Sequence, residues 1–190
     1  NKMTLITINS CYILLPAFIL YLLALFVGTR KKNYHAVQYF TVITVAIYLL
    51  AVIHLVFFPI EVYPGGYEST GPLWLAILKE IEFIPVLTID IPTFVLNIIM
   101  LIPFGVYLPL LNDKVDTARK AAKYGFFLSL TIELLQLTIE VIVGSGRTSD
   151  VNDLIANTLG AALGFLIIKK LVKIKLFKVM VSKLSLAKSA

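Results

Sequence analysis

Long apolar segments alternate with short polar stretches along this chain, and five of the segments are long enough to cross a bilayer. About 20 helical residues span the roughly 30 Å hydrocarbon core of a membrane. The pattern therefore predicts an all-α fold, a polytopic membrane helical bundle with five transmembrane helices. The segments are 5–28, 38–60, a third from near Pro92 to 111, 121–143 and 150–168.

The composition agrees with a membrane protein rather than a soluble domain. Of the 190 residues, 59% are hydrophobic and 15% are charged, and the mean hydropathy is +0.92. These values predict a single membrane domain over 1–190. The net charge of +6 would suggest a nucleic-acid partner in a soluble protein, but here the charges gather at helix ends, so no nucleic acid is expected.

The positions of Lys and Arg predict the orientation, because these residues accumulate in short cytoplasmic loops. Of the 17 Lys and Arg residues, only Lys2, Lys79 and Arg147 fall on the side that holds the N-terminus. This places the N-terminus outside and the C-terminus in the cytoplasm. The tail, 169–190, is basic and amphipathic, and we expect it to rest on anionic lipid headgroups.

Polar residues inside the fourth and fifth segments are the main functional candidates. A charged side chain near the centre of a membrane helix is opposed by about 2.5 to 3.5 kcal/mol on insertion scales, so such residues mark functional sites. They form two stripes, each spaced i, i+3, i+7 along one helical face. The first stripe is Glu133, Gln136 and Glu140, and the second is Asp150, Asp153 and Asn157.

The predicted topology also gives each polar residue a depth, at 1.5 Å per helical residue. Glu133 falls about 16 Å from the outer boundary and Asn157 about 10 Å. Asn97 in the third segment and His54 in the second fall at a similar depth to Asn157. Polar groups of four helices thus lie in the outer leaflet, which predicts a cavity there that opens to the outside.

Each candidate also has an ordinary structural interpretation. Asp150 stands where a helix N-cap belongs, and Asp153 would favour the positive end of the same helix. Glu133 caps nothing, so its alternative is a hydrogen bond between helices, as it is for Asn97 and Asn157.

Four further residues of the fourth and fifth segments and of the turn between them have structural interpretations too. Glu140 lies near headgroup level, where a solvated charge is expected. Arg147 either neutralises the acidic stripes or binds a phosphate bidentately. Gly160 and Gly164 form GxxxG, which predicts close helix packing.

Three blocks of the chain, in order, resemble the signature of the VanZ-like family, small integral membrane proteins named after a teicoplanin-resistance protein. The blocks are NIIMLIPFGVYLPLL at 97–111, IELLQ at 132–136 and GRTSDVNDLIANTLGAALG at 146–164. The matching residues are Asn97, Pro103, Gly105, Glu133, Gln136, Arg147, Asp150, Asp153, Asn157 and Gly160. The resemblance covers about 91–168 and implies a role in the bacterial cell envelope and in low-level teicoplanin resistance, without a settled chemistry.

The common enzyme motifs are missing from the sequence: there is no HExxH, CxxC, GxSxG or Gly-rich phosphate loop. The catalytic candidates are therefore the carboxylates Glu133, Asp150 and Asp153. With His54 they could hold a divalent cation such as Mg²⁺ against a lipid-linked pyrophosphate. Two of the carboxylates could instead act as acid and base.

The leading interpretation is a multi-pass protein of the bacterial cytoplasmic membrane that binds or alters an outer-leaflet, lipid-linked cell-wall component. One alternative is an intramembrane enzyme acting on a lipid-linked phosphate or pyrophosphate. The other is a non-catalytic structural or regulatory protein, or a carrier of lipid or protons. The expected ligand-binding residues are Asn97, Gln136, Arg147, Asn157 and His54.

Overall fold

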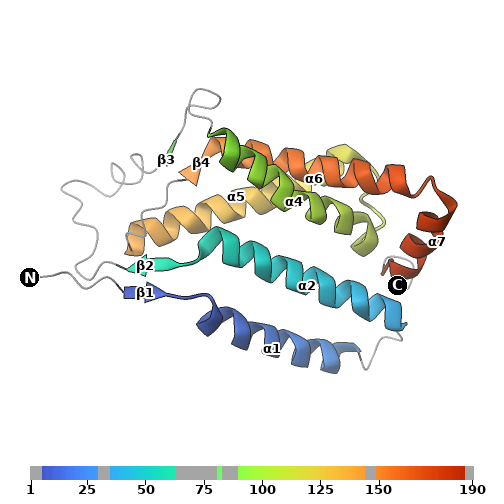
Figure 1. Cartoon of the computed structure of the whole chain (residues 1–190), viewed down its shortest axis with the longest axis horizontal. Helices are drawn as coiled ribbons and strands as arrows, with labels where there is room; N and C mark the ends of the chain where they lie inside the picture. Colours follow the sequence, from blue (N-terminus) through green and yellow to red (C-terminus); the bar gives the residue numbers. More distant parts are fainter. Residues whose placement is uncertain (1–5, 30–34, 63–80, 83–89, 144–148, 187–190) are drawn as a thin grey trace, which may run out of the picture.

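The computed structural model describes residues 6–29, 35–62, 81–82, 90–143 and 149–186. Long helices run side by side through most of this part of the chain (Figure 1). They are α1 (Cys11–Thr29), α2 (Ala36–Phe57), α4 (Ile91–Leu111), α5 (Ala118–Val143) and α6 (Val151–Leu171), and a short helix α7 (Lys175–Leu184) follows α6.

Four of the described helices, α2, α4, α5 and α6, are long and apolar enough to cross a membrane. The first helix is a shorter apolar helix over the part whose side chains are described, Cys11–Leu25. The structure therefore confirms a mostly helical, multi-pass membrane architecture.

Besides the helices, the described residues form four short strands at one end of the bundle, which the all-α prediction did not include (Figure 1). Strand β1 (Ile6–Ile8) pairs antiparallel with β2 (Ile60–Val62), and β3 (Ile81–Glu82) pairs parallel with β4 (Ser149–Asp150). The segment predicted to be helical from residue 5 thus begins its helix only at Cys11. Apolar β-branched residues such as those of β1 suit a strand as well as a membrane span, so hydropathy alone misassigned them.

Helices α4 and α6 pack with their backbones in close contact, and glycines make this possible. A Cβ added at Gly164 would lie 2.0 Å from the carbonyl oxygen of Ile102, and one added at Gly105 would lie 2.0 Å from that of Ala161. No side chain fits at such distances. The close packing predicted from Gly160 and Gly164 is therefore confirmed, and Gly105 belongs to the same interface.

The second helix joins the bundle through side chains rather than through its backbone. Val52 and Val56 of α2 form a buried apolar cluster with Ile132 of α5, and Met100 of α4 packs against this cluster. The hydroxyl of Tyr48 on α2 donates a hydrogen bond to the carbonyl oxygen of Met100 at 2.8 Å.

The end of the bundle opposite the strands carries α7, whose C-terminal end is fastened to α2 and α4 (Figure 1). Gln38 Nε2 on α2 donates to the Ser185 carbonyl oxygen at 3.1 Å, and Thr41 Oγ1 donates to that of Leu184 at 2.9 Å. The backbone N–H of Leu186 donates to the Leu110 carbonyl oxygen at 2.8 Å. The tail is thus helical, as its amphipathic pattern predicts, and its last turn is held by these hydrogen bonds.

Candidate functional site

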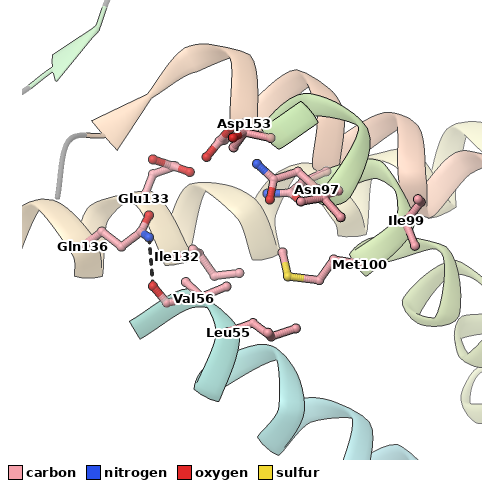
Figure 2. A pocket seen from close by; sticks show the side chains of 12 residues that line it. Leu55, Val56, Asn97, Ile99, Met100, Ile132, Glu133, Gln136 and Asp153 are labelled. Atoms are coloured by element: carbon pink, nitrogen blue, oxygen red, sulfur yellow. Dashed lines mark hydrogen bonds between the residues drawn. The ribbon is translucent and has the colours of Figure 1, made fainter. Parts of the chain in front are cut away.

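A cavity of about 410 Å³ lies between α2, α4, α5 and α6 (Figure 2). Its volume falls within the range of about 300 to 1,000 Å³ that is usual for small-molecule sites. The lining residues are Leu55, Val56, Thr93, Leu96, Asn97, Ile99, Met100, Ile132, Glu133, Gln136, Asp153 and Asn157. The structure therefore brings together Asn97, Glu133, Gln136, Asp153 and Asn157, five of the candidate residues.

Glu133 connects the middle of α5 to the chain that enters α6. Its side chain is buried, and its Oε2 accepts a hydrogen bond from Ser149 Oγ at 2.9 Å and another from the backbone N–H of Asp150 at 3.1 Å. Within hydrocarbon such polar groups must find partners inside the protein. The hydrogen bond between structural elements that was the alternative for Glu133 is therefore present, and the same residue lines the cavity.

The two aspartates at the start of α6 differ in position. Asp150 Oδ1 accepts a hydrogen bond from the backbone N–H of Asn152 at 2.7 Å, which makes Asp150 the N-cap of α6. The Asp150 side chain is not among the residues that line the cavity. Asp153 does line it, and its carboxyl group points toward that of Glu133 (Figure 2).

Two asparagines on facing helices each hold an unpaired polar atom at the cavity. Asn157 on α6 is 2% exposed, and its Nδ2 donates to Ser129 Oγ at 2.9 Å. Within the described part of the chain, its Oδ1 has no hydrogen-bond partner, and neither has Nδ2 of Asn97 on α4; both atoms are buried. These residues were predicted to bond across helices or to bind a ligand. The structure satisfies only part of their hydrogen-bonding capacity.

Gln136 closes the cavity on the side of α2. Its Nε2 donates to the carbonyl oxygen of Val56 at 3.2 Å, as the dashed line in Figure 2 shows. Because α2 ends at Phe57, the Val56 carbonyl belongs to the last turn, where carbonyls lack helical donors. The Gln136 side chain therefore holds the end of α2 against α5.

Three other residues do not join this group in the described structure. His54 is exposed and does not line the cavity. Arg147 lies outside the described residues. Glu140 is 3% exposed, so the expected solvated charge at headgroup level was wrong. Depth alone does not tell which side of a helix faces the protein, and Glu140 shares the inward face of Glu133.

The described residues do not assemble the metal site considered from the sequence. Nowhere in the described ranges do three or more His, Cys, Asp or Glu side chains come together in a way that could hold a metal ion. The constellation of Glu133, Asp150, Asp153 and His54 is dispersed because Asp150 caps a helix and His54 faces outward.

Two serines support the site and were not identified from the sequence as functional partners. Ser129 is fully buried against Asn157, and Ser149 is buried against Glu133. A signal for Ser129 does exist, because it stands four residues before Glu133 on the same polar face of its helix. Small hydroxyl groups are common in membrane helices, so this signal is weak by itself.

The fold and this cavity define a helical, multi-pass membrane protein with a polar site within its bundle. Residues 45–176 match the family model described as VanZ/LLP1, and the chain therefore belongs to the VanZ/LLP1 family. The matched range contains all twelve cavity-lining residues. VanZ itself is linked to teicoplanin resistance. No curated protein and no solved structure matches the chain.

Proposed function

We propose that this protein binds an outer-leaflet, lipid-linked cell-wall component in the cavity and thereby lowers sensitivity to teicoplanin-type glycopeptides. The observation that carries the proposal is that one cavity has both a polar lining and an exposed apolar wall. A lipid-linked ligand has the same two parts, a polar head and a hydrocarbon chain.

The polar lining has a high free-energy cost within a membrane-spanning bundle. It combines the carboxyl groups of Glu133 and Asp153 with the amides of Asn97, Gln136 and Asn157. Polar and ionisable groups inside a bilayer are costly, and they commonly mark a ligand or ion site. Carboxyl and amide groups together are suited to hydrogen-bonding a neutral head group that carries hydroxyl or amide functions.

The apolar wall supports entry of a lipid chain from the side. Leu55 on α2 is 63% exposed, and Leu96 and Ile99 on α4 are 63% and 55% exposed. All three line the cavity, and in a membrane-spanning helix such exposed apolar side chains face lipid. A hydrocarbon chain can therefore lie along these residues while its head group occupies the polar part of the cavity.

The charge distribution supports an outward-facing cavity. Glu133 of the cavity lining is hydrogen-bonded to Ser149 of β4, so the cavity lies close to that strand. Strand β4 and the Lys-rich α7 lie at opposite ends of the bundle (Figure 1). By the positive-inside rule, the α7 end is cytoplasmic and the strand end is outside. The proposed arrangement has five membrane-crossing helices, including α1, in the bacterial cytoplasmic membrane. The site then faces the leaflet in which glycopeptide targets are exposed.

We also propose that α7 rests on anionic headgroups of the cytoplasmic leaflet. Its Leu176 and Met180 side chains are exposed apolar groups, and Lys175, Lys178 and Lys183 lie on the same short helix. A basic amphipathic helix of this kind binds at the membrane interface, and each Lys near an anionic surface contributes about 1 kcal/mol. Replacing the three lysines with Gln should lower the anionic lipid that copurifies with the protein; unchanged lipid content would contradict this role.

The main test is teicoplanin susceptibility of cells that express the parent protein, Glu133→Gln or Asp153→Asn at matched membrane levels. Both variants keep the size of the side chain and remove a carboxyl group from the cavity. We expect both to lose protection. Leu159→Ala is the matched control, because Leu159 is an exposed apolar residue of α6 that does not line the cavity. Full protection by both carboxyl variants would overturn the proposal.

A second candidate function is an intramembrane enzyme, and one observation favours it. The carboxyl groups of Glu133 and Asp153 point toward one another at the cavity (Figure 2). Two carboxyl groups beside one ligand can serve as general acid and general base. Incubation of the purified protein with a polyprenyl pyrophosphate, followed by mass spectrometry, separates the candidates. A new product establishes turnover, whereas binding without a product supports the binding function.

A further inference from the structure

We propose that Asn97 and Asn157 together bind a secondary amide in the head group of the ligand, so that the ligand is an N-acylated or peptide-bearing lipid rather than a bare lipid phosphate. This inference rests on the proposed function and specifies the chemical class of its ligand. Its basis is that Asn97 and Asn157 both line the cavity and carry between them one unsatisfied donor atom and one unsatisfied acceptor atom.

Unpaired polar atoms of this kind are uncommon inside proteins. Most buried polar side-chain atoms have a hydrogen-bond partner, and an unpaired one carries the full cost of its desolvation. Among the described residues, Nδ2 of Asn97 and Oδ1 of Asn157 are the buried side-chain nitrogen and oxygen atoms without a partner. Both residues line the cavity. Beside the other polar groups of the lining, these two residues therefore leave one hydrogen-bond donor and one acceptor without a partner from the described part of the protein.

The surrounding structure holds the two asparagines in place before any ligand arrives. Asn157 is anchored by its hydrogen bond to Ser129, which is fully buried. Asn97 is adjacent in the chain to Ile98, whose carbonyl oxygen would lie 2.3 Å from a Cβ added at Gly160. Gly160 is one helical turn beyond Asn157. The close backbone contact of α4 and α6 thus fixes the backbone positions from which the two asparagine side chains extend, which lowers the ordering cost of binding.

A secondary amide complements this pair because it carries its acceptor and its donor on two different atoms. Its carbonyl oxygen can accept from Asn97 Nδ2 while its N–H donates to Asn157 Oδ1. The two asparagine atoms come from different helices, so a group with separated donor and acceptor can meet both in one position. A hydroxyl group carries its donor and acceptor on a single oxygen, so it can meet both asparagine atoms only where they lie close together.

The remaining polar lining favours a neutral group over a phosphate at this position. Glu133 and Asp153 are the ionisable residues of the described lining, and it contains no Lys, Arg or His. A phosphate here would meet acidic groups in a low-dielectric environment without a balancing cation from the described lining. The phosphate of a lipid-linked ligand is therefore expected nearer headgroup level, with the amide deeper in the cavity.

Binding can be measured with the full-length protein in nanodiscs and a series of polyprenyl phosphate probes. One probe carries a 2-acetamido sugar, the second the same sugar with a 2-hydroxyl group, and the third no sugar. We expect the acetamido probe to bind about tenfold more tightly than the hydroxyl probe, as two net hydrogen bonds would give. Equal affinity for these two probes would overturn the inference.

A second test changes the protein instead of the probe. Asn97→Leu removes the Nδ2 donor and leaves an apolar side chain of similar size. The preference for the acetamido probe should fall from about tenfold to about threefold, because the hydrogen bond to Asn157 remains. Asn97→Asp is the second variant; it keeps the shape and removes the N–H donor, and its preference should fall in the same way. Leu159→Ala is the control and should keep the full preference. A preference that stays at about tenfold in both Asn97 variants, each monodisperse and folded, would contradict the assignment.

The probe series also separates this inference from the proposed function. If the parent protein binds no polyprenyl probe, the proposed function itself fails. If it binds all three probes equally, the binding function stands and the amide inference is wrong. The amide could belong to an N-acyl sugar or to a peptide bond. A fourth probe with a capped dipeptide in place of the sugar distinguishes these two sources: Asn97-dependent binding of either head group supports the inference and identifies its source.

Discussion

Helix α4 contacts its neighbours α6 and α2 in two different ways. Against α6, the two backbones lie so close together that a Cβ at Gly105 or Gly164 would not fit. Against α2, the contact is made by side chains such as Val52 and Met100 and by the hydrogen bond from Tyr48. The cavity lies in this second, looser contact.

The difference shows how one small bundle can combine a rigid frame with an accessible site. Without a hydrophobic driving force between helices in lipid, small residues permit the close packing that fixes two helices together. The α4–α6 pair therefore holds Asn97 and Asn157 in fixed positions. The looser boundary with α2 leaves the space in which a ligand can meet them, and it places Leu55 beside the lipid.

The largest expected effect comes from disrupting the close interface with Gly164→Val. The new side chain would begin 2.0 Å from the Ile102 carbonyl oxygen, so the two backbones must separate. We expect a loss of about 3 kcal/mol in the free energy of unfolding, measured as a lower thermal midpoint of the detergent-solubilised protein. Leu163→Val is the control, because Leu163 is an exposed neighbour on α6. Equal stability of the two variants would mean that α4 and α6 do not pack as described.

A smaller effect is expected where α5 meets the start of α6, and two substitutions of one residue separate structure from function. Glu133→Ala leaves the Ser149 hydroxyl and the Asp150 N–H without their acceptor. This should cost about 2 kcal/mol of stability. Glu133→Gln keeps an acceptor oxygen and should stay within about 0.5 kcal/mol of the parent. Chemical denaturation in detergent measures both values.

One outcome for these two Glu133 variants would contradict the role of hydrogen-bond acceptance. If Glu133→Gln is as unstable as Glu133→Ala, the carboxylate charge rather than hydrogen-bond acceptance holds this region together. Loss of teicoplanin protection in Glu133→Gln would then report misfolding and not a binding defect.

Helical spacing predicted much of the site, because spacing decides which residues share a face. Glu133 and Gln136 stand one turn apart, as do Asp153 and Asn157, and both pairs line the cavity together. The GxxxG spacing of α6 likewise predicted its close packing.

What the sequence did not predict depends on contacts made far along the chain or on the rotation of a helix. His54 has a suitable depth but faces outward. Asp150 has the right spacing but its carboxylate caps its own helix. The pairing of Ile6–Ile8 with Ile60–Val62 joins residues more than fifty positions apart, and local hydropathy contains no information about that pairing. The apolar half of the cavity was missed because exposed leucines are ordinary in any membrane helix.

The smallest expected effect concerns the hydrogen bond between α5 and the last turn of α2. Gln136→Leu removes the hydrogen bond to the Val56 carbonyl, and a hydrogen bond between membrane helices contributes on average about 0.6 kcal/mol. Global stability should therefore change little, whereas hydrogen exchange of the last turn of α2 should become faster, because Gln136 holds that turn to α5. Thr138→Val is the matched control: Thr138 donates only within α5, to the Leu134 carbonyl. If both variants accelerate exchange in α2 equally, Gln136 does not hold α2 against α5. If only Gln136→Leu does so, this hydrogen bond holds the end of α2 independently of the packing between α4 and α6.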